Sequence, residues 1–229
     1  MQASKPLRSV FVTGSDTGVG KTVFTAALTR RLRARGVAAV ALKPLCSGGR
    51  DDARALHAAA GAALTLDEVN PWHFRAPLAP TLAARREGRC IKISMVASQV
   101  RSVAQQNAVT LVEGAGGLLS PLTEDGDNRH LLAALRPEAV AVVVPNRLGA
   151  VNQARLVLAA LAKVHRRRVA VVLVDQPRPD AAARTNAALL AEFAPGVPMV
   201  CLPWLAAGRI TPRAAAALDA VALALRIDG

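Results

Sequence analysis

A glycine-rich turn at residues 14–22 constrains the fold of this chain more than any other feature. It reads Gly-Ser-Asp-Thr-Gly-Val-Gly-Lys-Thr, follows the β-prone run Val10–Thr13 and opens a helical pattern that extends to about Arg35. In a strand–turn–helix unit of this kind, the N–H groups of the turn and the positive end of the helix dipole converge on phosphate groups. Lys21 can then reach the β- and γ-phosphates, and the Thr22 hydroxyl can ligate Mg2+. Five residues rather than four separate the two outer glycines, which predicts a variant of this loop.

The length and composition of the chain favour one globular domain. Its 229 residues are 52% apolar, which suffices for a single α/β domain over residues 1–229 with a sizeable core. No apolar run approaches the roughly 20 residues that span a bilayer, and residues 1–8 lack the apolar centre of a signal peptide. The three cysteines are widely spaced and fit reduced thiols. We therefore expect a cytoplasmic protein with no membrane partner.

Strand-like and helical segments alternate along the chain. The strand-like runs are Val10–Thr13, Val37–Lys43, Val109–Glu113, Val140–Pro145, Val169–Val174 and Met199–Leu202. Helical periodicity occupies residues near 20–35, 94–107, 150–164, 181–193 and 213–225. This alternation predicts an α/β fold with a mostly parallel sheet and helices on both faces. Ligands of such sheets lie beyond the carboxyl ends of the strands, so we expect the functional residues there.

The net charge of +13 raises the question of nucleic acid. Arginine dominates the basic residues, and the densest basic run, at residues 163–168, has no aromatic neighbours on which bases would stack. We interpret this run as a solvated loop and expect no nucleic-acid partner, whereas an anionic small ligand agrees with the charge.

Two further strand ends carry chemically suggestive residues. Lys43 precedes a proline at the end of its strand, where its ammonium could stabilise charge on a transferring phosphoryl group. Glu113 ends another apolar strand and is followed by Gly-Ala-Gly-Gly, across from the phosphate-binding loop. With Thr22 and Asp52 it would supply hard oxygen ligands for Mg2+. The alternatives are a solvated lysine at a strand edge and an incidental acid beside a glycine turn.

Several segments, taken together and in this order, resemble the dethiobiotin synthetase family over most of the chain. They are residues 11–22, Lys43-Pro-Leu-Cys-Ser-Gly48, 52–56, 69–74, Ala76-Pro-Leu-Ala-Pro80, 87–88, Val112-Glu-Gly-Ala-Gly-Gly117, Leu148-Gly-Ala-Val-Asn152 and Leu202-Pro-Trp-Leu205. The longer glycine spacing of the loop is the spacing that this family uses. The resemblance implies a single-domain P-loop NTPase fold and a homodimer with the substrate near the subunit interface.

The resemblance also implies a reaction. ATP and Mg2+ would drive the ring closure of 7,8-diaminononanoate with CO2 or bicarbonate, giving dethiobiotin, ADP and phosphate. One amine would capture CO2 as a carbamate, whose oxygen attacks the γ-phosphate to give a carbamic-phosphoric anhydride. The second amine would then close the cyclic urea and expel phosphate.

Residue roles follow from the same resemblance. Lys43 and Lys21 would be catalytic, Ser47 would contact the diamine or carbamate, and Thr22, Asp52 and Glu113 would surround the metal. Gly149, Ala150, Val151 and Asn152, at a helix start, would hold the substrate carboxylate, although an ordinary turn is an equal alternative. The expected nucleotide-binding residues are Asp16, Thr17, Gly18, Val19, Gly20, Lys21, Thr22, Val23, Asp52, Glu113, Gly114, Ala115, Gly116, Asp175, Pro203, Trp204 and Leu205.

Two positions depart from the family pattern. Asp175 stands where members often carry an asparagine that reads adenine, and a carboxylate cannot donate to a ring nitrogen. The sequence therefore leaves open which base of the nucleoside triphosphate the protein prefers. The family can also place a tyrosine near the substrate where this chain reads Arg184-Thr-Asn-Ala187, and the chain contains no tyrosine.

Other classes of protein share the strand–loop–helix start. A DNA-associated, partition-type ATPase would suit the positive charge, but such proteins usually carry a second lysine early in the loop, where this chain has Ser15 and Asp16. Amide-forming cobalamin-pathway synthetases tend to be longer, with a glutaminase domain. A structural nucleotide-binding module would leave Lys43, Asp52 and Glu113 without a role.

Overall fold

The structure is a computed structural model that describes residues 8–162, 164 and 168–228. The amino-terminal segment in which no signal peptide was expected lies almost wholly outside the described residues. The same is true of most of the basic run at 163–168 and of one residue near the end of the helix expected at 150–164.

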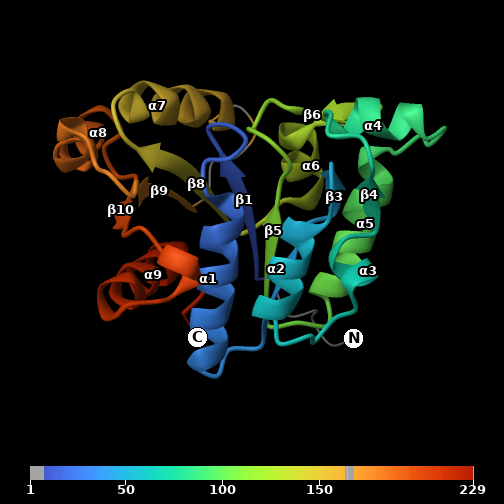
Figure 1. Ribbon diagram of the computed structural model, residues 1–229, viewed down its shortest axis with the longest axis horizontal. Helices are drawn as coiled ribbons and strands as arrows, with labels where there is room; N and C mark the ends of the chain where they lie inside the picture. Colours follow the sequence, from blue (N-terminus) through green and yellow to red (C-terminus); the bar gives the residue numbers. More distant parts are fainter. Residues whose placement is uncertain (1–7, 163, 165–167, 229) are drawn as a thin grey trace, which may run out of the picture.

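A six-stranded sheet forms the centre of the molecule (Figure 1). Its strands are β1 (Ser9–Gly14), β2 (Ala39–Leu42), β5 (Val109–Glu113), β8 (Ala139–Asn146), β9 (Arg168–Asp175) and β10 (Met199–Leu202). They lie in the order β10-β9-β8-β1-β5-β2, and every neighbouring pair is parallel. All six predicted strands are thus confirmed in one sheet, and their carboxyl ends meet at one edge.

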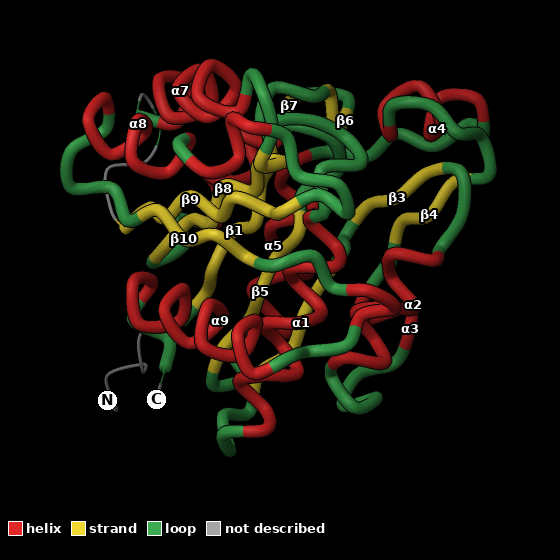
Figure 2. The backbone as a smooth tube through the Cα atoms, turned by 60° about the vertical axis from the view of Figure 1, so that its left-hand side comes forward, coloured by secondary structure: helices red, strands yellow, loops and turns green. Residues whose placement is uncertain are grey.

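Two small sheets that the sequence did not predict lie beside the main one. β3 (Leu45–Ser47) pairs in parallel with β4 (Trp72–Phe74), and β6 (Pro121–Thr123) pairs antiparallel with β7 (Gly126–Asp127). Figure 2 shows β3 and β4 side by side, next to the main sheet and away from β8–β10.

Helices cover both faces of the main sheet, as predicted. α1 (Lys21–Ala34), α2 (Asp51–Ala59) and α9 (Pro212–Leu225) pack on one face. α5 (Ile93–Ala104), α6 (Asn128–Leu135), α7 (Ala150–Leu161) and α8 (Asn186–Phe193) pack on the other. The short helices α3 (Leu66–Val69) and α4 (Pro80–Arg86) precede and follow β4. Two 3-10 turns, η1 (Ala181–Arg184) and η2 (Ala206–Gly208), complete the described elements.

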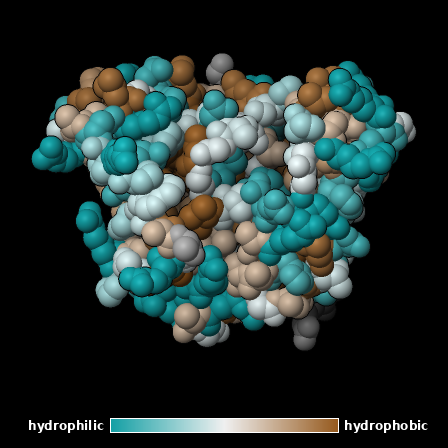
Figure 3. All heavy atoms as spheres, viewed as in Figure 1, coloured by the Kyte–Doolittle hydropathy of each residue, from teal (hydrophilic) through white to brown (hydrophobic). Residues whose placement is uncertain are grey.

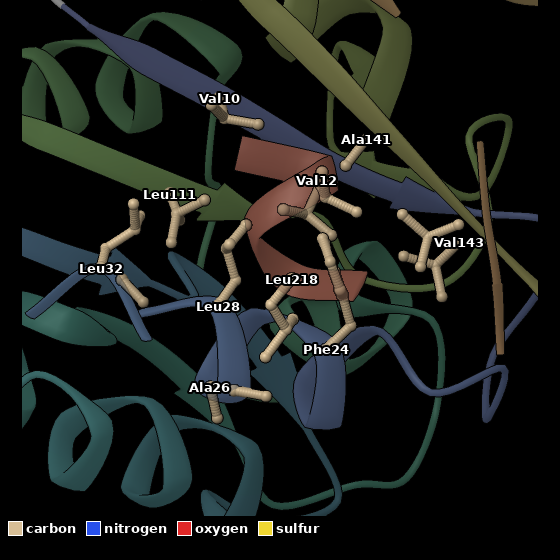
Figure 4. Close-up of a cluster of buried hydrophobic side chains, with 14 of the residues drawn as sticks. Val10, Val12, Phe24, Ala26, Leu28, Leu32, Leu111, Ala141, Val143 and Leu218 are labelled. Carbon is tan, nitrogen blue, oxygen red and sulfur yellow. The ribbon is translucent and has the colours of Figure 1, made fainter. Parts of the chain in front are cut away.

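Two hydrophobic clusters lie on the opposite faces of the main sheet, the first under α1, α2 and α9 and the second under α5, α6, α7 and α8. Side chains of β1 alternate between them. Val10 and Val12 face the first cluster, where Phe24 of α1 and Leu218 of α9 are fully buried (Figure 4), whereas Phe11 faces the second. Each such apolar side chain stabilises the fold by about 1.5–3 kcal/mol when it is buried. Because β1 is packed on both faces, the loop that follows it rests on a rigid support.

Two expectations need correction. The helix predicted at 181–193 is two elements, η1 and α8, because the Asp180 carboxylate accepts from the Ala183 N–H and starts a separate turn. The strand predicted at Val37–Lys43 is shorter, and Lys43 leaves the sheet by donating its N–H to the Val69 carbonyl at 2.9 Å.

The described surface is mixed in character. Figure 3 shows a mostly hydrophilic face on which hydrophobic residues gather in separate patches, including patches near α4 and over α7 and α8. Leu82 of α4, Leu156 of α7 and Phe193 of α8 are each about half exposed. Among the described helices, none is long and apolar enough to cross a membrane. The single domain over residues 1–229 stays a prediction.

Candidate active site

The phosphate-binding loop lies between the end of β1 and the start of α1. The Ser15 N–H donates to the Val143 carbonyl of β8 at 3.1 Å, which ties the loop to the neighbouring strand. Gly20 immediately precedes α1 with a φ of 97°, a left-handed conformation that favours glycine. No side chain caps the first N–H groups of α1, so they remain available to an anion.

The Lys21 ammonium rests against its own loop. Its Nζ donates to the Asp16 carbonyl oxygen at 2.6 Å, and the residue is only 5% exposed. Burial, together with the positive charge of Lys43, lowers the pKa of Lys21 from 10.5 to about 8. A phosphate group would relieve both effects, so the loop is prepared for an anionic ligand.

Glu113 lies at the centre of a buried polar cluster. Its Oε1 accepts from the Thr22 hydroxyl at 2.7 Å and from Lys43 Nζ at 2.6 Å. Its Oε2 is buried without a hydrogen-bond partner in the described structure. Glu113 ends β5 and Lys43 follows β2, and these neighbouring parallel strands bring the two charges together.

Lys43 also bridges to the helix side of the site. Its Nζ lies 3.2 Å from the Asp52 Oδ2, at the start of α2, and 3.4 Å from the Gly114 carbonyl oxygen. Burial lowers the pKa of Lys43, but the negative charges of Glu113 and Asp52 outweigh burial and hold the pKa above its ordinary value. Lys43 therefore carries a positive charge across the physiological pH range.

These groups face one cavity of about 830 Å³, a size typical of small-molecule sites. Twelve of the predicted site residues line it: Thr17, Gly18, Gly20, Lys21, Thr22, Val23, Lys43, Ser47, Asp52, Glu113, Ala115 and Gly116. The phosphate loop and the lysine–carboxylate cluster thus belong to a single site.

Other predicted residues lie outside the lining of this cavity. Val19 packs back toward Gly14, while Asp16 and Gly114 contribute main-chain oxygens to the two lysines. The segment Gly149–Asn152 begins α7, Asp175 is the last residue of β9, and Pro203–Leu205 follow β10. Within its segment, Leu205 is 6% exposed and belongs to the core.

The structure adds residues that the sequence reasoning missed. Pro77, Leu78, Ala79 and Pro80 form one wall, and Cys46, Ser120 and Pro121 complete the lining. The conspicuous Ala-Pro-Leu-Ala-Pro motif at 76–80 was the signal that could have identified that wall. The Ser47 hydroxyl donates to the Leu78 carbonyl, so the wall and β3 hold each other in place.

The site suits a divalent cation of the magnesium class. The donor set is hard oxygen: the Thr22 hydroxyl, the Asp52 carboxylate and the buried, unpartnered Oε2 of Glu113. Among the described residues there is no cluster of three or more histidine, cysteine or acidic side chains that would hold a metal by itself. Magnesium usually takes only one or two protein carboxylates, with phosphate oxygens and water beside them, so this sparse set fits.

Comparison with known proteins distinguishes between the classes of P-loop protein that share this fold. A family model described as an AAA domain matches residues 8–208. The ATP-dependent dethiobiotin synthetase BioD of Anaeromyxobacter dehalogenans (strain 2CP-C) is 41% identical over 203 residues, covering 86% of this chain and 91% of that protein. The BioD of Xanthomonas oryzae pv. oryzae (strain PXO99A) is 41% identical over 160 residues, covering 66% of this chain and 71% of that protein.

Solved structures support the fold. The MinD cell division protein of Aquifex aeolicus superposes with a TM-score of 0.62 at 15% identity, covering 96% of each chain. The signal recognition particle receptor FtsY of Elizabethkingia anophelis, in complex with GDP, gives a TM-score of 0.56 at 17% identity, covering 96% of this chain and 64% of that chain. At such identities the likeness shows the P-loop NTPase fold alone.

Proposed function

Because the chain belongs to the ATP-dependent dethiobiotin synthetase family, we propose that its cavity carries out each step of dethiobiotin formation from 7,8-diaminononanoate and CO2. The protein is a ligase of biotin biosynthesis that depends on ATP. The observation that carries the finer proposal is the Lys43–Glu113–Thr22 cluster, which faces the phosphate loop across one cavity.

The first step forms a carbamate. A neutral amine of the diamine attacks CO2, its N–H proton leaves to solvent, and the product carries a negative charge on oxygen. Ser47 lines the cavity, and its hydroxyl donates a hydrogen bond to the Leu78 carbonyl. The hydroxyl oxygen can therefore accept a hydrogen bond from an amine N–H. Ser47 therefore orients the amine without acting as a base.

The second step transfers the γ-phosphoryl group. A carbamate oxygen attacks phosphorus, the bond to the ADP oxygen breaks, and a carbamic-phosphoric anhydride results. Such transfers depend mostly on positioning and charge stabilisation. Lys21 binds the phosphates from the loop, and the buried Lys43 stabilises the charge that develops between carbamate and phosphate.

The third step closes the ring. The second amine attacks the carbamate carbon, the C–O bond to phosphate breaks, and inorganic phosphate leaves with the electron pair while the amine loses its proton. The cavity walls, which include residues 77–80, 115, 116, 120 and 121, hold the second amine close to this anhydride, so that ring closure competes with hydrolysis.

Thr22, Glu113 and Asp52 would hold Mg2+, with the buried Oε2 of Glu113 as an oxygen that has no other partner among the described residues. When bound, the cation supplies charge neutralisation to the phosphate oxygens. The role of the protein residues is to keep their oxygens directed at that position.

We extend the proposal to assembly and location. The Gly149–Asn152 helix start does not line the cavity of its own chain, so a second copy would present it to a substrate carboxylate in a homodimer. The exposed Leu82, near the cavity wall, provides apolar surface for such an interface. A cytoplasmic location agrees with the proposed substrates.

The proposal is tested by incubating the protein with diaminononanoate, bicarbonate, Mg2+ and ATP. We expect phosphate release that requires the diamine, with dethiobiotin identified by mass spectrometry. Phosphate release that DNA stimulates and the diamine does not affect would overturn the proposal in favour of a DNA-associated ATPase.

A further inference from the structure

The order of strands divides the site into a reactive half and a nucleoside half. The phosphate loop follows β1 in the middle of the sheet. On one side of it, Lys43 follows β2 and Glu113 ends β5. On the other side lie the carboxyl ends of β8, β9 and β10. A triphosphate whose γ end meets Lys43 therefore extends its nucleoside over these three strand ends.

Asp175 is the last residue of the middle one of these three strands. Gly20 of the phosphate loop packs on Val174, since a Cβ added to Gly20 would lie 3.5 Å from the Val174 Cγ1 atom. Asp175 is the next residue, at the end of β9, and is half-buried. Trp204, just beyond β10, is 49% exposed and offers a stacking surface, which favours every base alike.

Neighbouring amides fix the Asp175 carboxylate in place. Asn146 Nδ2 donates to the Asp175 Oδ1 at 2.8 Å and to the Ala183 carbonyl at 3.0 Å. The amide of Asn146 is itself oriented by Asn186, whose Nδ2 donates to the Asn146 Oδ1 at 3.0 Å. Among the described groups, these contacts use only the Oδ1 atom of the Asp175 carboxylate. The Oδ2 atom is therefore left for a ligand.

The Asp175 carboxylate consequently offers an acceptor at the strand end. One N–H of the Gln176 amide donates to the Val174 carbonyl at 2.9 Å, and no hydrogen bond to the Gln176 amide oxygen is found among the described groups. A carboxylate can accept two parallel hydrogen bonds but can donate none. Guanine presents two adjacent donors, N1–H and the 2-amino group. Adenine presents one donor, at its 6-amino group, next to the N1 lone pair, which would face the second carboxylate oxygen.

We propose that Asp175 determines the base that this protein accepts, and that it admits guanine nucleotides, so that GTP serves alongside ATP. The inference rests on the proposed function and specifies the nucleotide of that reaction. Asn146 and Asn186 are positioning residues that hold the carboxylate toward the base.

The test compares kcat/KM for ATP, GTP and ITP in the wild type, in Asp175→Asn and in Asp219→Asn. Inosine keeps N1–H and lacks the 2-amino group, so ITP isolates the second hydrogen bond. Asp219→Asn makes the same chemical change on α9, where the carboxylate pairs with Arg31, and serves as the matched control. A bidentate contact typically discriminates by about 5- to 150-fold, so Asp175→Asn should lower the GTP-to-ATP ratio of kcat/KM by that factor.

We expect ITP to lie below GTP in the wild type and Asp219→Asn to leave the ratio unchanged. A ratio that Asp175→Asn leaves unchanged, or a wild type that does not use GTP, overturns the inference while the proposed function stands. Calorimetric titration with GDP and ADP measures the same preference without the diamine. The inference therefore fails or survives independently of dethiobiotin formation.

Discussion

The lysine–glutamate pair at the centre of the site allows a quantitative prediction. Lys43→Met keeps the length of the side chain but removes its charge, leaving Glu113, whose side chain is fully buried, with only the Thr22 hydroxyl as a partner. Breaking a buried pair from one side costs about 3–5 kcal/mol, because the remaining charge is desolvated and unpaired. For a chain of this size that cost lowers Tm by about 6–20 °C.

The double variant Lys43→Met/Glu113→Gln makes the prediction sharper. It removes both charges, and the glutamine oxygen still accepts from Thr22, so much of the lost unfolding free energy should return. Urea unfolding followed by far-UV circular dichroism measures all four corners of this cycle. Additive losses, in which the double variant loses the sum of what the two single variants lose, would show that the two charges are not coupled and would refute the reasoning.

Activity in the same variants is a separate readout. Turnover of Lys43→Met, measured well below its unfolding temperature, should fall by about a thousandfold or more, and the double variant should not recover it. Recovery of activity together with stability would mean that Lys43 acts only by holding Glu113 in place.

Three further predictions follow from the neighbouring groups. Because Lys21 is protonated only below its pKa of about 8, ATP affinity measured by calorimetry should fall as the pH rises from 7 to 9.5, and Lys21→Arg should flatten this profile. Over the same pH range, Lys21 binds more protons in the unfolded chain than in the folded chain. The contribution of Lys21 to the free energy of unfolding should therefore rise with pH. Thr22→Val should abolish the gain in ADP affinity that Mg2+ produces over EDTA, whereas Thr22→Ser should retain it. Gly114→Ala would place a Cβ 2.5 Å from the Oδ1 of the buried Asn128 and should destabilise the fold by about 1–3 kcal/mol in thermal unfolding.

The sequence predicted the parts of the fold that follow from apolar patterning. Each strand of the main sheet contains a run of mostly apolar residues, rich in valine in β8 and β9, and such runs form buried parallel strands. The loop, Lys43 and Glu113 could be placed together because parallel strands align their carboxyl ends. The site cluster was therefore predictable from three strand ends.

The remaining parts depend on contacts distant in sequence. β3 and β4 are three residues each, and the fully buried Asn70 stabilises their pairing by donating to the carbonyls of residues 43, 44 and 72. α2 has four alanines among its nine residues, so Leu56 is the one large apolar side chain that marks its buried face. The break at residue 185 involves two distant contacts besides the Asp180 cap, because the Asn186 amide donates to Asn146 and to the Arg147 carbonyl. No local pattern indicates such pairings.

The division of the nucleotide between two groups of strands has a consequence for how this enzyme can change. The proposed reactive groups, Lys43 and Glu113, lie at the ends of β2 and β5, whereas Asp175 ends β9, three strands away from β5 in the sheet. Substitutions at β9 can therefore alter which triphosphate of the cellular pool is consumed without disturbing the ring-closing chemistry. The base-binding end of the site can therefore vary in evolution while the reactive end at β2 and β5 is kept.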